Sequence, residues 1–155
     1  MATEFDELRA SSRRALAAAH SVHTGMSLFL AWRISDRSFA DALVAFDLTP
    51  RQYSLLLNLA ADAPLSQREL VERVGVDRSG VGRQIDDLEQ RGLVERRATP
   101  GDRRAHAVHI TTAGAERLRE ADGAVQHTLR EVYAPLTDEE NVELGRLLTK
   151  IVEHR

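Results

Sequence analysis

The 155-residue sequence contains no cysteine, which excludes disulfide bonds, thiolate zinc sites and cysteine-based redox sensing. It has no apolar run near the roughly 18 residues that a membrane span requires, and its N-terminus lacks the basic-then-apolar order of a secretory signal. The HExxH, GxSxG, GxGxxG and P-loop motifs are missing as well. We therefore predict a cytoplasmic protein that is not an enzyme and that uses no cofactor.

Lysine is nearly absent: 20 of the 21 basic residues are arginine, which suits bidentate recognition, although compositional bias alone explains most of the ratio. The net charge of −3 is unevenly distributed. Residues 66–111 hold 9 basic and 8 acidic side chains, whereas residues 1–65 hold 6 and 7, and residues 112–155 hold 6 and 9. A nucleic-acid site is therefore expected in residues 66–111, with modest and strongly salt-dependent binding.

Residues 66–90 have the pattern of two short helices joined by a tight turn. Ser66 and Glu69 stand at the spacing of a reciprocal capping box, and Gly75 is expected to end the first helix. Asp77 is the expected N-cap of the second helix. That helix directs three apolar residues inward at the i, i+4, i+7 spacing: Val81, Ile85 and Leu88.

The opposite face of this second helix, near its start, is where a helix-turn-helix protein contacts base edges in the major groove. Arg83 is the strongest candidate, because arginine can bind guanine O6 and N7 through two hydrogen bonds. Arg78 is assigned mainly to phosphate, since it begins the helix at the positive end of the dipole. The alternative for Arg83 is an i, i+4 ion pair with Asp87 on a solvated face. The predicted DNA contacts on this helix are Arg78, Ser79, Gly80, Arg83 and Gln84.

A hairpin is predicted behind this helix. Residues 93–97 and 105–111 have strand-like patterns, and the intervening TPGDRR contains turn residues. Asp102, Arg103 and Arg104 would lie at or just after the tip of the hairpin, where long cationic side chains can enter a narrow minor groove.

This segment resembles the winged helix-turn-helix of the MarR family of bacterial transcription regulators. The similarity covers LTPRQYSLLLNLA (48–60), DRSGVGRQIDDLEQRGLVERR (77–97) and GDRRAHAVHITTAG (101–114). The resemblance implies that Arg104 is the wing arginine that enters the minor groove and that Asp102 braces it. Gly80 and Gly82 stand where the family usually has Thr and Ser, which places more of the base reading on Arg83.

The resemblance implies a mainly α fold with a small antiparallel β-hairpin, an α+β arrangement in one domain over residues 1–155. Residues 48–111 would be the winged lobe, and residues 26–47 and 112–155 the dimerisation helices. Residues 1–25 read as an N-terminal extension, with Gly25 expected to interrupt the helix. The apolar stripe of the last helix is assigned to the dimer interface, the alternative being packing on the chain's own first helix. Its residues are Leu144, Leu148 and Ile151.

Relatives in the family often bind phenolic or aromatic effectors between the dimerisation helices and the DNA-binding lobe. The candidate residues for such a site are Trp32, Arg33, Tyr53 and His127. The alternative, which we favour for Trp32 and Tyr53, is that these rings provide bulk in the core. His20 and His23 form an HxxH pair without an obvious third ligand, so no metal site is predicted.

The sequence therefore predicts a homodimeric, sequence-specific regulator, a repressor rather than an activator, that binds a pseudo-palindromic operator and is released by a small aromatic effector. A DNA architectural protein with little sequence preference is the first alternative. A protein-interaction module is the second.

Overall fold

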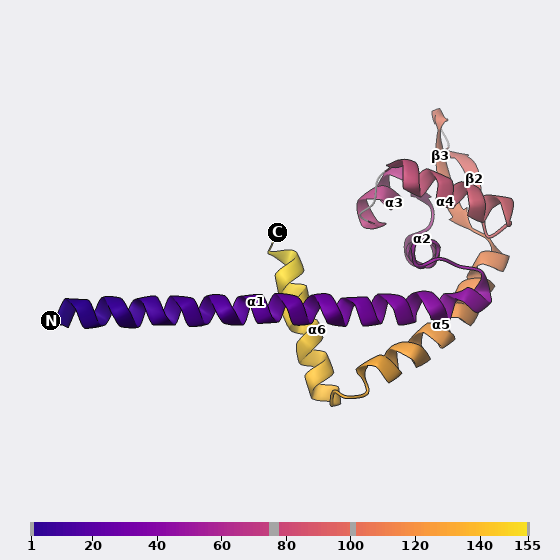
Figure 1. Cartoon of the computed structure of the whole chain (residues 1–155). Coiled ribbons are helices and arrows are strands. Elements are labelled where there is room, and N and C mark those ends of the chain that lie inside the picture. Colours follow the sequence, from indigo (N-terminus) through magenta and orange to yellow (C-terminus); the bar gives the residue numbers. More distant parts are fainter. Residues whose placement is uncertain (1, 75–77, 100–101, 155) are drawn as a thin grey trace. The chain divides into compact units, whose positions relative to one another are not determined.

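The computed structural model describes residues 2–74, 78–99 and 102–154 of the chain, and it describes side chains for residues 20–74, 79–98 and 106–154 (Figure 1). The chain divides into two compact units, residues 1–37 and residues 38–155. Each unit is described by itself below.

The first unit is part of one long helix, α1 (Ala2–Leu43), whose C-terminal end belongs to the second unit. The expected interruption at Gly25 is wrong, because the helix continues through it. A single glycine in a helix costs only about 1 kcal/mol relative to alanine, and the residues on both sides have helical propensity. Apolar side chains on this stretch are exposed, among them Phe29, Trp32 and Ile34.

The second unit begins with the end of α1 and a short 3-10 helix, η1 (Val44–Phe46), followed by α2 (Pro50–Asp62). Thr49 caps α2: its hydroxyl accepts from the Gln52 amide, and the Gln52 side chain accepts from the Thr49 amide. Asp47 adopts a left-handed conformation (φ 53°), which turns the chain from η1 into this cap.

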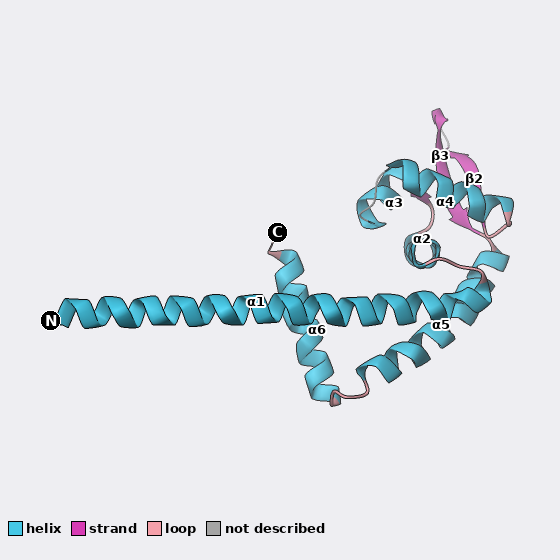
Figure 2. Ribbon diagram, viewed as in Figure 1, coloured by secondary structure: helices cyan, strands magenta, loops and turns pink. Residues whose placement is uncertain are grey.

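The winged lobe follows, with helices and hairpin in the predicted order (Figure 2). It contains β1 (Leu65–Ser66), α3 (Gln67–Val74), α4 (Arg78–Gln90), β2 (Val94–Thr99) and β3 (Asp102–Ile110). The antiparallel sheet has the order β1-β3-β2, with Leu65 opposite Val108 and Val94 opposite Ile110. The capping box of Ser66 and Glu69 is confirmed. Gly75 and Asp77 lie outside the described residues.

Two helices complete the chain, α5 (Thr112–Tyr133) and α6 (Asp138–Glu153). Thr111 caps α5, and Thr137 with Glu140 forms a capping box at the start of α6. The core joins the end of α1, α2, α3, α4, the sheet and α5. Its most deeply buried side chains are Leu43, Leu55, Leu56, Leu59, Leu70, Ile85, Leu88, Val81, Val94 and Val108.

Gly114 marks a close approach of two backbone segments, at the point where α5 begins behind the wing. A Cβ atom at this position would lie 2.0 Å from the Leu93 carbonyl oxygen, which belongs to the backbone and cannot rotate away. We expect Gly114→Ala to lower the free energy of unfolding by about 1–3 kcal/mol through overpacking, measured by urea denaturation.

Gly123 provides the matched control for this prediction, because it lies in the same helix and a Cβ atom there would meet nothing within 4 Å. Gly123→Ala should leave stability unchanged or raise it by up to about 1 kcal/mol. Equal stability of the two variants would show that α5 can shift away from β2 at no cost.

Candidate nucleic-acid interface

Helix α4 packs against the rest of the winged lobe through the three residues that the sequence predicts. Val81, Ile85 and Leu88 are each at most 1% exposed, and they join the core formed by α2, α3 and the sheet. At about 100° per residue, the opposite side of α4 carries Ser79 and Arg83. Both residues are exposed, so the helix presents a polar face to solvent.

The Arg83 side chain is exposed on the side of α4 that faces away from the core. Among the residues that the structure describes, no hydrogen bond or ion pair involves its guanidinium group. The alternative ion pair with Asp87 is not formed, because Asp87 instead accepts from Gln52 and Arg91. An exposed arginine near the start of α4 is available to bind a guanine or a phosphate.

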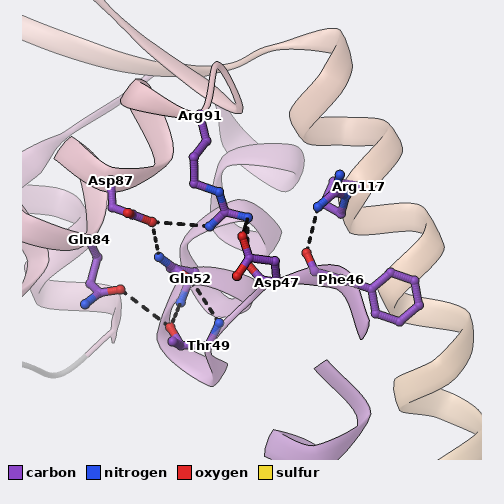
Figure 3. Close-up of polar contacts among 8 residues, drawn as sticks. All are labelled: Phe46, Asp47, Thr49, Gln52, Gln84, Asp87, Arg91 and Arg117. Carbon is purple, nitrogen blue, oxygen red and sulfur yellow. Dashed lines mark hydrogen bonds and ion pairs between the residues drawn. The ribbon is translucent and has the colours of Figure 1, made fainter. Parts of the chain in front are cut away.

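Two other predicted contacts on α4 are placed differently. Gly80 is buried, which contradicts its assignment to the outward face: it precedes Val81 by one residue and so lies about 100° around the helix from it. Gln84 is half-buried, and its side-chain oxygen accepts a 3.5 Å hydrogen bond from the Thr49 hydroxyl (Figure 3). In this position Gln84 contacts the N-terminus of α2.

Gly82 is the second glycine at which this chain departs from the usual family residue. A Cβ atom at position 82 would lie 3.0 Å from Nε2 of Gln67, the first residue of α3. Because this atom is the end of a flexible side chain that can rotate away, the contact does not by itself require glycine at this position.

The wing is the β2–β3 hairpin, whose strands pair from Val94 opposite Ile110 to Thr99 opposite Asp102, with an irregularity between Ala98 and Thr99. The predicted wing residues Asp102, Arg103 and Arg104 lie in β3, but their side chains are outside the described part of the chain. The same holds for Arg78, the first residue of α4. Their DNA contacts stay predictions.

Arg96 of β2 connects the wing to α4, a contact that the sequence pattern did not indicate. One guanidinium nitrogen lies 2.6 Å from Asp86, another contacts Glu89, and the Arg96 amide donates to Glu89 at 2.9 Å. Partial burial of Arg96 would lower the pKa of the guanidinium, but its hydrogen bonds to the two carboxylates raise that pKa overall. The arginine therefore remains charged and holds both acids.

A second polar cluster joins the other flank of α4 to α2 (Figure 3). Gln52 is only 5% exposed, and its Nε2 donates to Asp87 at 2.7 Å. Arg91 donates to Asp87 at 3.2 Å and to the Asp47 carbonyl at 2.5 Å. Because Arg117 of α5 donates to the Phe46 carbonyl at 2.7 Å, the loop between η1 and α2 is bound to both α4 and α5.

The four candidate effector residues belong to two separate units of the chain, so the structure does not define a single site from them. Trp32 and Arg33 lie in the first unit, where both are exposed and Arg33 lies 5.8 Å from the ring centroid of Phe29. His127, in the second unit, is exposed and lies 3.8 Å from Glu131. The expectation that Trp32 fills the core is therefore wrong: with 57% exposure, its ring is open to solvent on α1.

Tyr53 does belong to the core, as the favoured alternative predicts. It is 7% exposed, packs edge to face on Phe39 with ring centroids 5.3 Å apart, and donates a 2.7 Å hydrogen bond to Asp122 of α5. Burial, and then the hydrogen bond and charge of Asp122, raise the pKa of Tyr53 to about 12. The hydroxyl therefore stays protonated at neutral pH and links α2 to α5.

The predicted interface residues lie on α6, where Leu144 and Leu148 are half-buried and Ile151 is 56% exposed. Within the part of the chain that the structure describes, no helix is long and apolar enough to cross a membrane. Over the same residues, no group of three His, Asp or Glu side chains is arranged to hold a metal ion.

Comparison of the sequence with known proteins finds transcription regulators. A sequence profile of the MarR family matches residues 46–105. A protein of Thauera aromatica, described as a transcriptional regulatory protein for the hcr operon, is 33% identical over 116 residues, which cover 74% of this chain and 70% of that protein.

Solved structures of DNA-binding regulators have a similar fold. An E. coli MarR variant in complex with operator DNA is 28% identical, with a TM-score of 0.77 over 85% of this chain and 95% of that one. Bordetella bronchiseptica BpsR, whose DNA binding is regulated by 6-hydroxynicotinic acid, shares the fold at 24% identity, with a TM-score of 0.76 over 84% of this chain and 98% of that one.

The fold, the exposed polar face of α4 and the hairpin beside it define a winged helix-turn-helix DNA-binding protein. The relatives identify the family as well: the chain belongs to the MarR family of transcription regulators, which are not enzymes.

Proposed function

We propose that this regulator is a repressor that binds a pseudo-palindromic operator as a homodimer, with α4 in the major groove and the wing in the adjacent minor groove. The observation that carries the proposal is the exposed Arg83 guanidinium, which has no partner among the described residues and lies on the outward side of a helix whose other side is anchored in the core. A single arginine near the start of such a helix can discriminate one base pair.

The homodimer part of the proposal is supported by apolar side chains that are exposed on the helices at both ends of the chain. On α1 these include Phe29, Trp32 and Ile34, and on α6 Leu147 and Ile151. Exposed clusters of large apolar side chains mark surfaces that bind a partner. A two-fold dimer built from them would place two recognition helices about one DNA turn apart, which matches an operator made of two half-sites.

Selection of bound duplexes from a random pool tests the proposal. We expect a recovered site with two-fold symmetry, preferred over random duplex by roughly 10³-fold or more in competition. Binding without a preferred sequence would favour the architectural alternative. Absence of binding even at low salt would favour a protein-interaction module.

The wing provides a separate prediction. If Arg104 neutralises a phosphate in or beside the minor groove, Arg104→Ala should weaken binding to all sequences evenly and should lower the slope of log K against log salt by about 1 per subunit. Fluorescence anisotropy titrations at several salt concentrations measure both quantities. A change of preferred sequence in this variant would instead mean that Arg104 reads bases directly.

Release by a small aromatic effector is the remaining part of the proposal. Its support is by analogy: the DNA binding of BpsR, a protein of the same fold, is regulated by an aromatic acid. The test is titration of the protein–operator complex with 6-hydroxynicotinic acid and with simple phenolic acids. An effector must bind the DNA-free state more tightly than the DNA-bound state. A complex whose affinity none of these compounds changes would contradict release by this class of compound.

A further inference from the structure

Two acidic residues stand where they could pair with Arg83 and hold its side chain on the protein. Asp86 follows Arg83 by three residues on α4, and Asp87 follows it by four. Both spacings bring oppositely charged side chains together on a helix surface. A guanidinium bound to either carboxylate would have to break that pair before it could reach DNA.

In the structure both acids are occupied by other partners. Asp86 binds Arg96 of β2 at 2.6 Å. On the other flank, Asp87 accepts from Gln52 at 2.7 Å and from Arg91 at 3.2 Å (Figure 3). Among the described residues Arg83 has no partner, so the acids beside it are held away from it.

Asp86 is expected to bind Arg96 in preference to Arg83. Its side chain is 24% exposed, and its planar group bridges Asp86 and Glu89 while its own amide is fixed by Glu89 at 2.9 Å. A partly buried guanidinium that binds two carboxylates is better ordered than an exposed arginine pairing along the surface of its own helix. Asp86 is therefore expected to stay with Arg96.

We propose that Arg96 is a positioning residue for DNA binding: by occupying Asp86 it leaves the Arg83 guanidinium available for a base, without touching DNA itself. The inference rests on the proposed function, because it requires that Arg83 contacts the operator. It also gives β2 a second role, since the strand that supports the wing controls the charge beside the recognition helix.

The first test is Arg96→Gln in the full-length protein, titrated against the selected duplex at fixed salt. Pairing of Asp86 with Arg83 should cost about twofold for each recognition helix, and therefore about fourfold on a site that binds two of them. The unpaired Glu89 adds repulsion toward phosphate, so we expect a total loss of roughly fourfold to tenfold. Adding Asp86→Asn, which restores the net charge, should bring the affinity back to within about twofold of wild type.

The second test is the same substitution in an Arg83→Ala background. If Arg96 acts through Arg83, Arg96→Gln should weaken binding by less than about twofold there, because no guanidinium remains for Asp86 to capture. Equal losses in the two backgrounds would overturn the inference, since general destabilisation or charge repulsion does not depend on Arg83. If Arg83→Ala bound like wild type, the proposed base reading would fail, and with it the inference.

Thermal unfolding followed by circular dichroism establishes whether Arg96→Gln is folded at the assay temperature. Arg91→Gln tests the same idea at the second acid should the first variant unfold. It leaves Asp87 with Gln52 alone, and we expect a loss of about twofold that the additional change Asp87→Asn removes. A loss that persists in the double variant would overturn the inference at this acid.

Discussion

Replacing Arg83 with alanine is expected to weaken binding to the selected operator by about 1–3 kcal/mol for each recognition helix, which corresponds to roughly 5- to 150-fold. The loss arises because an arginine that makes two hydrogen bonds to a guanine leaves that base edge unpaired when it is removed. The variant should also tolerate other bases at one position in each half-site. Anisotropy titrations with the selected duplex and with single-base variants measure both effects.

Arg119→Ala is the matched control, because Arg119 is an exposed arginine on α5 and the substitution removes the same charge. It should change affinity only slightly, through long-range electrostatics that higher salt screens. If Arg83→Ala kept the sequence preference of the wild type, the assignment of Arg83 to base reading would be wrong even if overall affinity fell.

Local signals in the sequence were sufficient to predict most of the fold. Capping pairs such as Thr49 with Gln52 and Thr137 with Glu140 define helix starts through short-range hydrogen bonds, and the structure forms both. The inward face of α4 followed from the helical repeat alone. These features depend on residues within one or two turns of each other, which is why the sequence specifies them.

Features that depend on distant residues were not predicted. The strand β1 is two residues long, too short for any periodic pattern, and it exists because Leu65 pairs with Val108. The place of Gly80 near the start of the helix predicts an outward position, but the residue is buried, and a helical repeat alone does not determine burial. The bridge from Arg96 to Asp86 joins a strand to a helix, and no spacing rule connects the two positions.

The candidate site was therefore predicted in part. Arg83 was identified from the face it shares with Ser79, and both are exposed. What the pattern could not determine was the state of the Arg83 side chain, because Asp87 stands at the right distance for an ion pair. The tertiary contacts of Asp87 with Gln52 and Arg91 occupy that carboxylate, and Asp86 binds Arg96. Arg83 therefore has no partner among the residues that the structure describes.

Leu148→Asp is expected to change both the oligomeric state of the protein and its affinity for the operator. A carboxylate on the apolar stripe of α6 would have to be buried without a partner in the proposed dimer, so the subunits should separate. Binding of the second half-site would no longer be intramolecular, and the operator affinity should fall by on the order of 10²- to 10⁴-fold. Sedimentation measures the first change, and titration with the two-fold-symmetric duplex measures the second.

Val142→Asp distinguishes the stripe from α6 as a whole. Val142 is 74% exposed and, at about 100° per residue, lies on nearly the opposite side of the helix from Leu144, Leu148 and Ile151. This variant should remain dimeric and should bind the operator almost as the wild type does, although it introduces the same charge into the same helix.

A Leu148→Asp protein that stayed dimeric would move the interface to another surface, and the exposed apolar side chains of α1 would be the next to test. If Leu148→Asp were monomeric but bound the full operator with unchanged affinity, the dimer would exist without contributing to DNA binding, and the proposed two-helix recognition would be wrong.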